Sequence, residues 1–353
     1  MKGNGRHRFA MYWAAGCGGC DISVLNLHEA VVDFAEHFDI VFWPAVVDTK
    51  YAALEALPDR SIDLTLFTGG IRNTENAELA RLLRRTSAVL VAFGSCATEG
   101  CVPGLANLRP VDDLVATAFE GPNTDNPDHL RPVPRWSAPE GELRLPEMSP
   151  LVRTLDQVVP VDYFVPGCPP EPARIAEVLG ELIPAVEGNA PFPPPGAVLG
   201  AGHSTVCDQC RRDRGIKRIA RFGRIQDVAA IDPALCLLEQ GLPCNGPATR
   251  DGCGAKCPAA GAPCIGCYGP ADGVLDFGAR LMSAFASVVD ASEPEAIELV
   301  LDGLPDPVGQ FYRFSLAGSL LRGSREVMAA AGPALPTTAP AEPALAAGRG
   351  THR

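Results

Sequence analysis

The stretch FAMYWAAGCGGCDISVLNLHE, residues 9–29, decides the fold of this chain. Its first seven residues, Phe9 to Ala15, are almost all apolar and predict a buried strand. A glycine-cysteine turn follows, and apolar residues at helical spacing predict an amphipathic helix from about Asp21 to His37. We expect Asp21 to cap that helix, or Asp21 with Ser23 to place acceptors on its free amides. A strand that leads through a short turn into a helix is the repeating unit of parallel α/β sheets.

The same alternation continues through the first half of the chain. Short apolar runs predict strands at 40–43, 62–67, 87–93 and 161–165, and amphipathic runs predict helices at 75–85 and 171–182. Strands that alternate with helices favour a parallel sheet covered on both faces. We therefore expect an α/β protein whose N-terminal domain, residues 1–190, is a flavodoxin-like parallel sheet.

Two segments interrupt this pattern. Residues 110–150 are rich in Pro, Asp, Asn and Glu, and we interpret them as a solvent-exposed surface loop. The run PFPPP begins at residue 191 and predicts a semi-rigid linker over 191–200.

Beyond the linker, cysteine, glycine and proline dominate as far as Pro270. Such a segment buries little apolar area, so bonds to a metal centre would have to supply much of its order. We expect a cysteine-rich, mostly irregular and helical domain over 201–331, with helices at about 272–289 and 318–330. The Ala/Pro-rich end, 332–353, is predicted to be a disordered tail.

Composition and charge exclude several classes of protein. The net charge of −12 predicts no binding to nucleic acid. No apolar run approaches the roughly 20 residues that would span a membrane, and the apolar positions before Gly16 are too few for a secretory signal. We therefore expect a cytoplasmic protein, in which thiols stay reduced and clustered cysteines serve metal or redox chemistry.

Twelve of the thirteen cysteines fall into three sets of four. The first set combines a CxxC turn with two single cysteines, all placed after apolar strands: Cys17, Cys20, Cys96 and Cys168. The carboxyl ends of parallel strands share the sheet edge where ligands bind. Four thiolates converging there would suit a cubane iron-sulfur cluster, and the neighbouring glycines allow close approach of the backbone. Four buried structural cysteines are the alternative.

The other two sets allow two kinds of metal site. They are Cys207, Cys210, Cys236 and Cys244, and then Cys253, Cys257, Cys264 and Cys267. Both spacings suit an iron-sulfur cluster and also a tetrahedral all-thiolate zinc site. The residues by themselves leave both readings open. His203 is a nearby nitrogen ligand candidate, which we interpret as a solvated or hydrogen-bonded loop residue.

An ordered series of motifs resembles the small subunit of nickel-iron hydrogenases. The similarity is greatest to the cytoplasmic methyl-viologen-reducing, F420-non-reducing type and runs from about Phe9 to Pro270. The motifs that carry it are GCGGCDISVLNLHE at 16–29, GGIRNTEN at 69–76, GSCATEGCVPGLANL at 94–108, PGCPP at 166–170, LEQGLPCNGPATRDGCGAKC at 238–257 and PCIGCYGP at 263–270.

This resemblance implies an electron-transfer subunit with three [4Fe-4S] clusters. The set that begins at Cys17 would hold the proximal cluster, the set that begins at Cys253 the medial cluster, and the set that begins at Cys207 the distal cluster. The catalytic nickel-iron centre would lie on a separate large subunit, and this chain would contribute no catalytic residue. The implied acceptor is a [2Fe-2S] adapter protein tied to a heterodisulfide-reductase-like complex.

Two positions depart from the pattern of that family. Thr68 stands where an acid often precedes the glycine pair at 69–70, which puts any role of that acid in doubt. Cys101, the thirteenth cysteine, stands where glycine is usual. We weigh it as an accessory ligand of the proximal cluster and favour a small packed core residue.

Two other functions remain open on the sequence. The first is a zinc-stabilised scaffold or interaction protein, which metal content would reveal. The second is a hydrogen-sensing or electron-input subunit without turnover, which a test of hydrogen-dependent viologen reduction would separate from a working hydrogenase.

Overall fold

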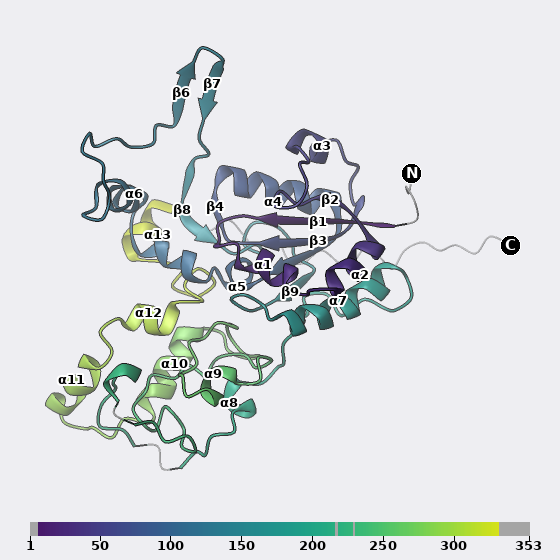
Figure 1. Ribbon diagram of the computed structural model, residues 1–353. Helices are drawn as coiled ribbons and strands as arrows, with labels where there is room; N and C mark the ends of the chain where they lie inside the picture. The colour runs from purple at the N-terminus through teal and green to yellow at the C-terminus, as the bar shows by residue number, and fades with distance from the viewer. Residues whose placement is uncertain (1–5, 216–217, 229, 332–353) are drawn as a thin grey trace.

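The computed structural model describes residues 6–215, 218–228 and 230–331, and its centre is a five-stranded sheet (Figure 1). The strands lie in the order β2-β1-β3-β5-β9, and every neighbouring pair is parallel. Counted along the chain, this is the 2-1-3-4-5 order of flavodoxin-like sheets. The predicted fold class is confirmed. The strands are β1 (His7–Trp13), β2 (Phe38–Phe42), β3 (Ile62–Thr68), β5 (Ser87–Phe93) and β9 (Tyr163–Val165).

Alternate residues of β1 point to opposite faces of the sheet and enter two separate cores. Phe9 and Met11 pack in the core that α2 and α7 cover, whereas Ala10 and Tyr12 pack in the core that α3 and α4 cover. Helices therefore lie on both faces (Figure 1). These helices are α2 (Ala30–His37), α3 (Tyr51–Glu55), α4 (Thr74–Thr86) and α7 (Pro172–Val186).

The helix predicted over 21–37 is two helices in the structure. α1 (Gly19–Leu25) ends before α2 begins, and between them His28 adopts a left-handed backbone conformation with φ 54°. A non-glycine residue in that region interrupts a right-handed helix. The predicted capping role of Asp21 is also wrong, because the N-cap is Gly18 and Asp21 lies inside the first turn.

Residues 110–150 hold more regular structure than the predicted loop. They contain α6 (Val111–Glu120) and a hairpin of β6 (Arg135–Ala138) and β7 (Gly141–Arg144), which projects from the body of the protein (Figure 1). The chain returns through β8 (Met148–Arg153), which pairs antiparallel with β4 (Ile71–Asn73). Most side chains from α6 to β7 are exposed, in agreement with a surface excursion.

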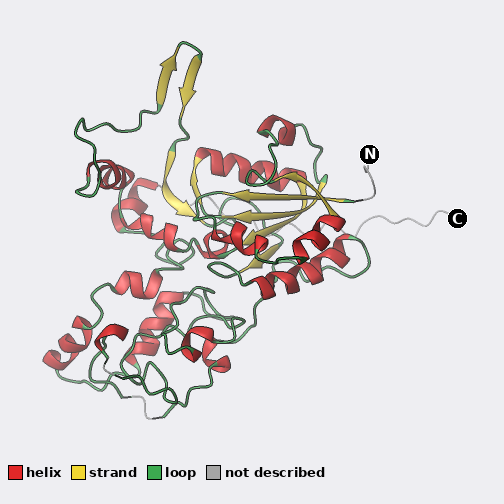
Figure 2. Cartoon of the chain, viewed as in Figure 1, coloured by secondary structure: helices red, strands yellow, loops and turns green. Residues whose placement is uncertain are grey.

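The second half consists of loops and short helices (Figure 2). Its hydrophobic core is larger than the sequence indicated, because Phe222 and Leu242 from the loops pack with Phe285 and Phe311 from the helices. The predicted helices at 272–289 and 318–330 are shorter in the structure, and α11 and α12 were not predicted. The helices are α8 (Val206–Gln209), η2 (Ile225–Asp227), α9 (Lys256–Ala259), α10 (Phe277–Ala286), α11 (Pro294–Asp302), α12 (Pro307–Tyr312) and α13 (Arg325–Ala331).

The two halves are joined by more than the linker. Gly318 N donates to Glu99 O at 3.1 Å, and Ser324 N donates to Asn107 O at 2.9 Å. α13 then packs on β8. The predicted tail, 332–353, lies outside the described residues. Among the helices that are described, none has both the length and the apolar character needed to span a membrane.

Candidate metal centres

The first four cysteines line one cavity at the carboxyl edge of the sheet. Cys17 and Cys20 lie in the turn after β1 and at the start of α1. Cys96 lies in α5 (Ser95–Glu99), directly after β5, and Cys168 follows β9. Parallel strands end at the same edge, so three segments far apart in sequence deliver sulfur to one place.

Two glycines let the backbone approach these sulfurs closely. Gly94 has φ 82° and ψ 155°, a backbone conformation that residues other than glycine almost never adopt. A Cβ atom on Gly94 would overlap the Cys20 sulfur. Gly19 also lines the cavity, and its N donates to Cys17 Sγ at 3.4 Å. The site therefore requires glycine, which has no side chain, at these positions as well as the thiols.

The four sulfurs are close enough to affect one another's ionisation. Burial raises the pKa of the Cys20 thiol above its usual range, and Cys96, Cys168 and Cys17 raise this pKa further. Deprotonation of thiols in this arrangement is unfavourable unless a cationic metal group compensates the negative charge of the thiolates. The donor set and the shared cavity fit an iron-sulfur cluster.

The second set, with Cys207 at its start, lines a separate cavity in the other half of the protein. All four of its cysteines face that space, together with Arg212 and Arg214. Cys207 lies in α8, and Cys210 follows the end of that helix. A capping box fixes the start of α8, because Asp208 accepts hydrogen bonds from both N and Oγ1 of Thr205 at 2.9 and 2.8 Å.

The charge environment of this second cavity also reflects its thiols. Burial, with smaller contributions from Cys244 and Cys236, raises the pKa of Cys207 to about 12, and the positive charge of Arg214 opposes the shift. A Cβ atom on Gly246 would lie 3.1 Å from the Cys207 sulfur. As in the first cavity, glycine backbone borders the sulfurs.

The third set comes together around Cys267. Burial, with smaller contributions from the nearby sulfurs of Cys253, Cys168 and Cys257, raises the pKa of its thiol to about 12. The loop that carries Cys253 is fixed to α8, since Gln209 Oε1 accepts from Gly252 N at 3.0 Å and from Gly254 N at 2.9 Å.

The third set lies between the other two. On the side of the first set, Ser95 Oγ donates to Cys267 O at 2.5 Å, and Cys96 packs with Cys267 around Phe314. On the side of the second set, Cys264 N donates to Cys244 Sγ at 3.3 Å. Neighbouring sets are thus linked by direct contacts between their ligand-bearing segments.

Cys101 contacts the first set from inside the protein. It is buried, and its sulfur is 3.5 Å from Cys168 Sγ. The Cys101 thiol, acting as donor, lowers the pKa of Cys168 to about 7. Its own backbone is strained, with φ 47° and ψ −151°.

Asp21 is a buried acid beside the first cavity that sequence reasoning did not assign to the site. Trp43 Nε1 donates to Asp21 Oδ1 at 2.9 Å, and Thr68 Oγ1 is 3.5 Å from Asp21 Oδ2. Burial raises the pKa of this carboxyl. Thr68 therefore lies next to an acid from another segment. Only the proximity of Asp21 to Cys20 in the sequence pointed to it.

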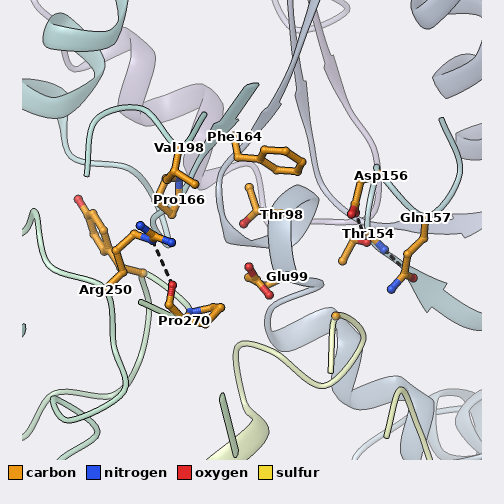
Figure 3. Close-up of a pocket in the computed structure, with 12 residues that line it drawn as sticks. Thr98, Glu99, Thr154, Asp156, Gln157, Phe164, Pro166, Val198, Arg250 and Pro270 are labelled. Carbon is orange, nitrogen blue, oxygen red and sulfur yellow. Dashed lines mark hydrogen bonds between the residues drawn. The ribbon is translucent and has the colours of Figure 1, made fainter. Parts of the chain in front are cut away.

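A polar cavity between the two halves was also not predicted (Figure 3). Its volume is about 240 Å³, and Glu99 lies at its centre between Arg250 and Asp156. Burial and the nearby charge of Asp156 together raise the pKa of Glu99 to about 8, and Arg250 opposes the shift. Thr98 Oγ1 and Tyr268 OH are buried without a hydrogen-bond partner in the described ranges. Ordered water in this cavity would satisfy them.

His203 lies at the surface, and its Nδ1 is 2.7 Å from Asp272 Oδ2. This is the hydrogen-bonded loop position that we expected. Throughout 6–215, 218–228 and 230–331, no three Cys, His, Asp or Glu side chains are gathered tightly enough for a single metal ion. The sulfurs of the first two sets surround cavities instead.

Comparison with known proteins assigns this arrangement to a family. The family described as NADH ubiquinone oxidoreductase, 20 Kd subunit, matches residues 17–182. The iron-sulfur subunit of the F420-non-reducing hydrogenase of Archaeoglobus profundus is 40% identical over 321 residues, which cover 89% of this chain and 97% of that protein. The chain belongs to the family of F420-non-reducing hydrogenase iron-sulfur subunits.

Other members and solved structures extend the comparison. The corresponding F420-non-reducing hydrogenase subunit of Methanothermobacter marburgensis is 36% identical, with 88% of this chain and 94% of that protein covered. A chain of an NAD+-reducing [NiFe]-hydrogenase is 31% identical over 54% of this chain and 96% of its own length, with a TM-score of 0.44. Membership in the family confirms the resemblance to hydrogenase small subunits and makes the chain part of an oxidoreductase.

Proposed function

We propose that this subunit carries electrons from hydrogen oxidation, at a nickel-iron centre on a separate large subunit, through three [4Fe-4S] clusters to an acceptor protein. The first set of cysteines would hold the proximal cluster, the third the medial cluster and the second the distal cluster. The observation that carries the proposal is that the four cysteines of the first set line one cavity and the four of the second set line another, since four thiolates are the ligand set of such a cluster.

The contacts between sets support the order proximal, medial, distal. Cys267 belongs to the middle set and packs against the cluster of Cys96, Cys101 and Phe314. Cys264, from the same set, adjoins Cys244. Electrons that enter at the sheet edge would therefore find the next site across a short protein bridge at each step.

The residues of this chain would tune and protect the bound clusters. When bound, the clusters supply one-electron redox chemistry. Backbone amides such as Gly19 N and Cys264 N donate to cysteine sulfurs, and such bonds stabilise the more negative, reduced state. Cys96, Cys244 and Cys264 are almost fully buried, which restricts water near the sulfur ligands.

Several finer assignments belong to the same proposal. The N-terminal domain would span 1–190, the linker 191–200 and the iron-sulfur domain 201–331. The complex would work in the cytoplasm. Its acceptor would be a [2Fe-2S] adapter protein attached to a heterodisulfide-reductase-like complex.

Metal analysis of the purified complex tests the cluster assignment. This chain should contribute about twelve irons and about twelve acid-labile sulfides, with a broad absorption near roughly 400 nm. Cys20→Ser, Cys264→Ser and Cys236→Ser should each perturb one set and leave the EPR signals of the other two. A colourless chain containing zinc would refute the proposal and support the scaffold function.

A second experiment tests turnover. The chain should co-purify with a large subunit that contains nickel, and the complex should reduce methyl viologen under hydrogen. A cluster-loaded complex that is inert toward hydrogen would instead support the sensing or electron-input function.

A further inference from the structure

A short basic segment stands out in this acidic protein. Residues 211–224, RRDRGIKRIARFGR, contain seven Arg or Lys and one Asp, a net charge of +6. The chain as a whole carries −12, so the other residues together carry −18. The segment follows Cys210 directly, next to the proposed distal site.

Most of these basic side chains face solvent. Arg211, Arg214, Arg218, Arg221 and Arg224 are all exposed. Two of them form exposed ion pairs, Arg218 with Asp290 at 3.9 Å and Arg224 with Asp227 at 3.4 Å. Exposed pairs of this kind neutralise little of the local field.

The remaining exposed arginines form no ion pair with a carboxylate of the described residues. Among the described residues, no carboxylate lies within 4.0 Å of a charged nitrogen of Arg211, Arg214 or Arg221. Arg212 differs from them, because it donates to the carbonyl oxygens of Pro258, Asp232 and Leu235 at 2.7–3.0 Å. Arg212 therefore fixes the loop, whereas its neighbours leave their charge available at the surface.

The backbone beneath these side chains is anchored to the core. Ile219 N donates to Val288 O and Asp290 N donates to Ile219 O, each at 2.9 Å. Both Ile219 and Phe222 are buried in the hydrophobic core of the second half of the protein. Asp213 N also donates to Ala234 O at 2.7 Å. A charged surface held at fixed points loses less conformational entropy when it binds than a free loop does.

The charged surface adjoins the cysteines of the second set. Arg214 lines the same cavity as Cys207 and Cys244, and its charge acts on Cys207. This half of the protein lies at the end opposite the β6–β7 hairpin (Figure 1). An acceptor that bound over the basic surface would thus lie beside the second cysteine set, the proposed distal site.

We propose that the exposed arginines of 211–224 form the docking surface for an electron-acceptor protein with an acidic surface. The inference rests on the proposed function and deepens it by specifying how the acceptor is recognised. The negative remainder of the chain repels an acidic partner and the basic surface attracts it, so encounters are oriented toward the second set. Each productive encounter passes one electron, which oxidises the distal site and reduces the acceptor.

Charge neutralisation of the intact complex tests this docking surface. The probe is an acidic [2Fe-2S] ferredoxin, and its affinity for the complex and its hydrogen-dependent reduction are both measured from low to high salt. Arg211→Gln, Arg218→Gln and Arg221→Gln are combined in one variant. The matched control combines Arg81→Gln, Arg135→Gln and Arg280→Gln, which are exposed arginines outside the segment.

At low salt the segment variant should bind and reduce the ferredoxin about 10- to 100-fold more weakly than wild type. The difference should shrink toward about 1 M salt, where screening acts over ~3 Å. Reduction of methyl viologen should not change. Equal ferredoxin affinity in wild type and variant, or an equal loss in the control, would overturn the docking proposal. Failure of wild type to reduce viologen under hydrogen would instead count against the proposed function, and the affinity measurement would still decide on docking.

Discussion

Substitution of Gly94 by alanine tests how the first cavity is built. Gly94 has φ 82° and ψ 155°, which costs a residue with a side chain about 1–3 kcal/mol. The new methyl group would also overlap the Cys20 sulfur. Since the preferred separation of such atoms is about 3.5–4 Å, Cys20 must move by more than about 1 Å. Such a shift removes a ligand from its position.

Gly188→Ala supplies the control for the backbone effect. Gly188 also has a positive φ, 78°, but a Cβ atom there would meet no atom within 4 Å. Both variants should lose stability, whereas only Gly94→Ala should lose metal. We expect its iron content to fall from about twelve to about eight atoms per chain, because one four-iron cluster is lost.

The assay is iron and sulfide analysis of the purified complex, with EPR of the reduced clusters and hydrogen-dependent viologen reduction. Gly94→Ala should lose the proximal signal and the activity, and Gly188→Ala should keep both. A Gly94→Ala complex with full iron content and unchanged proximal signal would refute the idea that bare backbone at this position is required for the site.

Three further predictions concern single residues. Cys257→Pro should convert the medial centre to a three-iron cluster with an EPR signal in the oxidised state, because three thiolates remain and proline is tolerated in the first turn of α9; no new signal would mean that Cys257 is not a ligand. Cys101→Gly should keep full iron content and unchanged oxygen sensitivity, with unfolding free energy within about 1 kcal/mol of wild type, because glycine relieves the strain at φ 47°; loss of iron would make Cys101 a ligand. Burial raises the pKa of Glu99 from 4.5 to about 8, so the folded state binds this proton more tightly and wild-type stability falls as pH rises through that window. Glu99→Gln should therefore gain stability relative to wild type between about pH 5.5 and 8.5 in thermal unfolding, and an equal difference at both pH values would contradict this assignment.

Much of the fold could be predicted from the local pattern of apolar and polar residues. Strand and helix periods depend on residues near one another in sequence, and the runs at 62–67 and 87–93 became β3 and β5 almost without change. Boundaries that depend on one backbone conformation were missed. The left-handed turn at His28 divides the helix predicted over 21–37. The prediction missed this break because the apolar spacing continues across it.

The sequence by itself determined the parallel α/β class, the grouping of twelve cysteines into three sets and the family of the chain. These three conclusions depend on the spacing of residues close together in the sequence and on the order of the motifs. The tertiary structure decided which sets adjoin one another. It also decided that Asp21 meets Thr68 and Trp43 and that Glu99 lies in a cavity between the halves. These relations join segments up to hundreds of residues apart, so packing rather than periodicity brings them together.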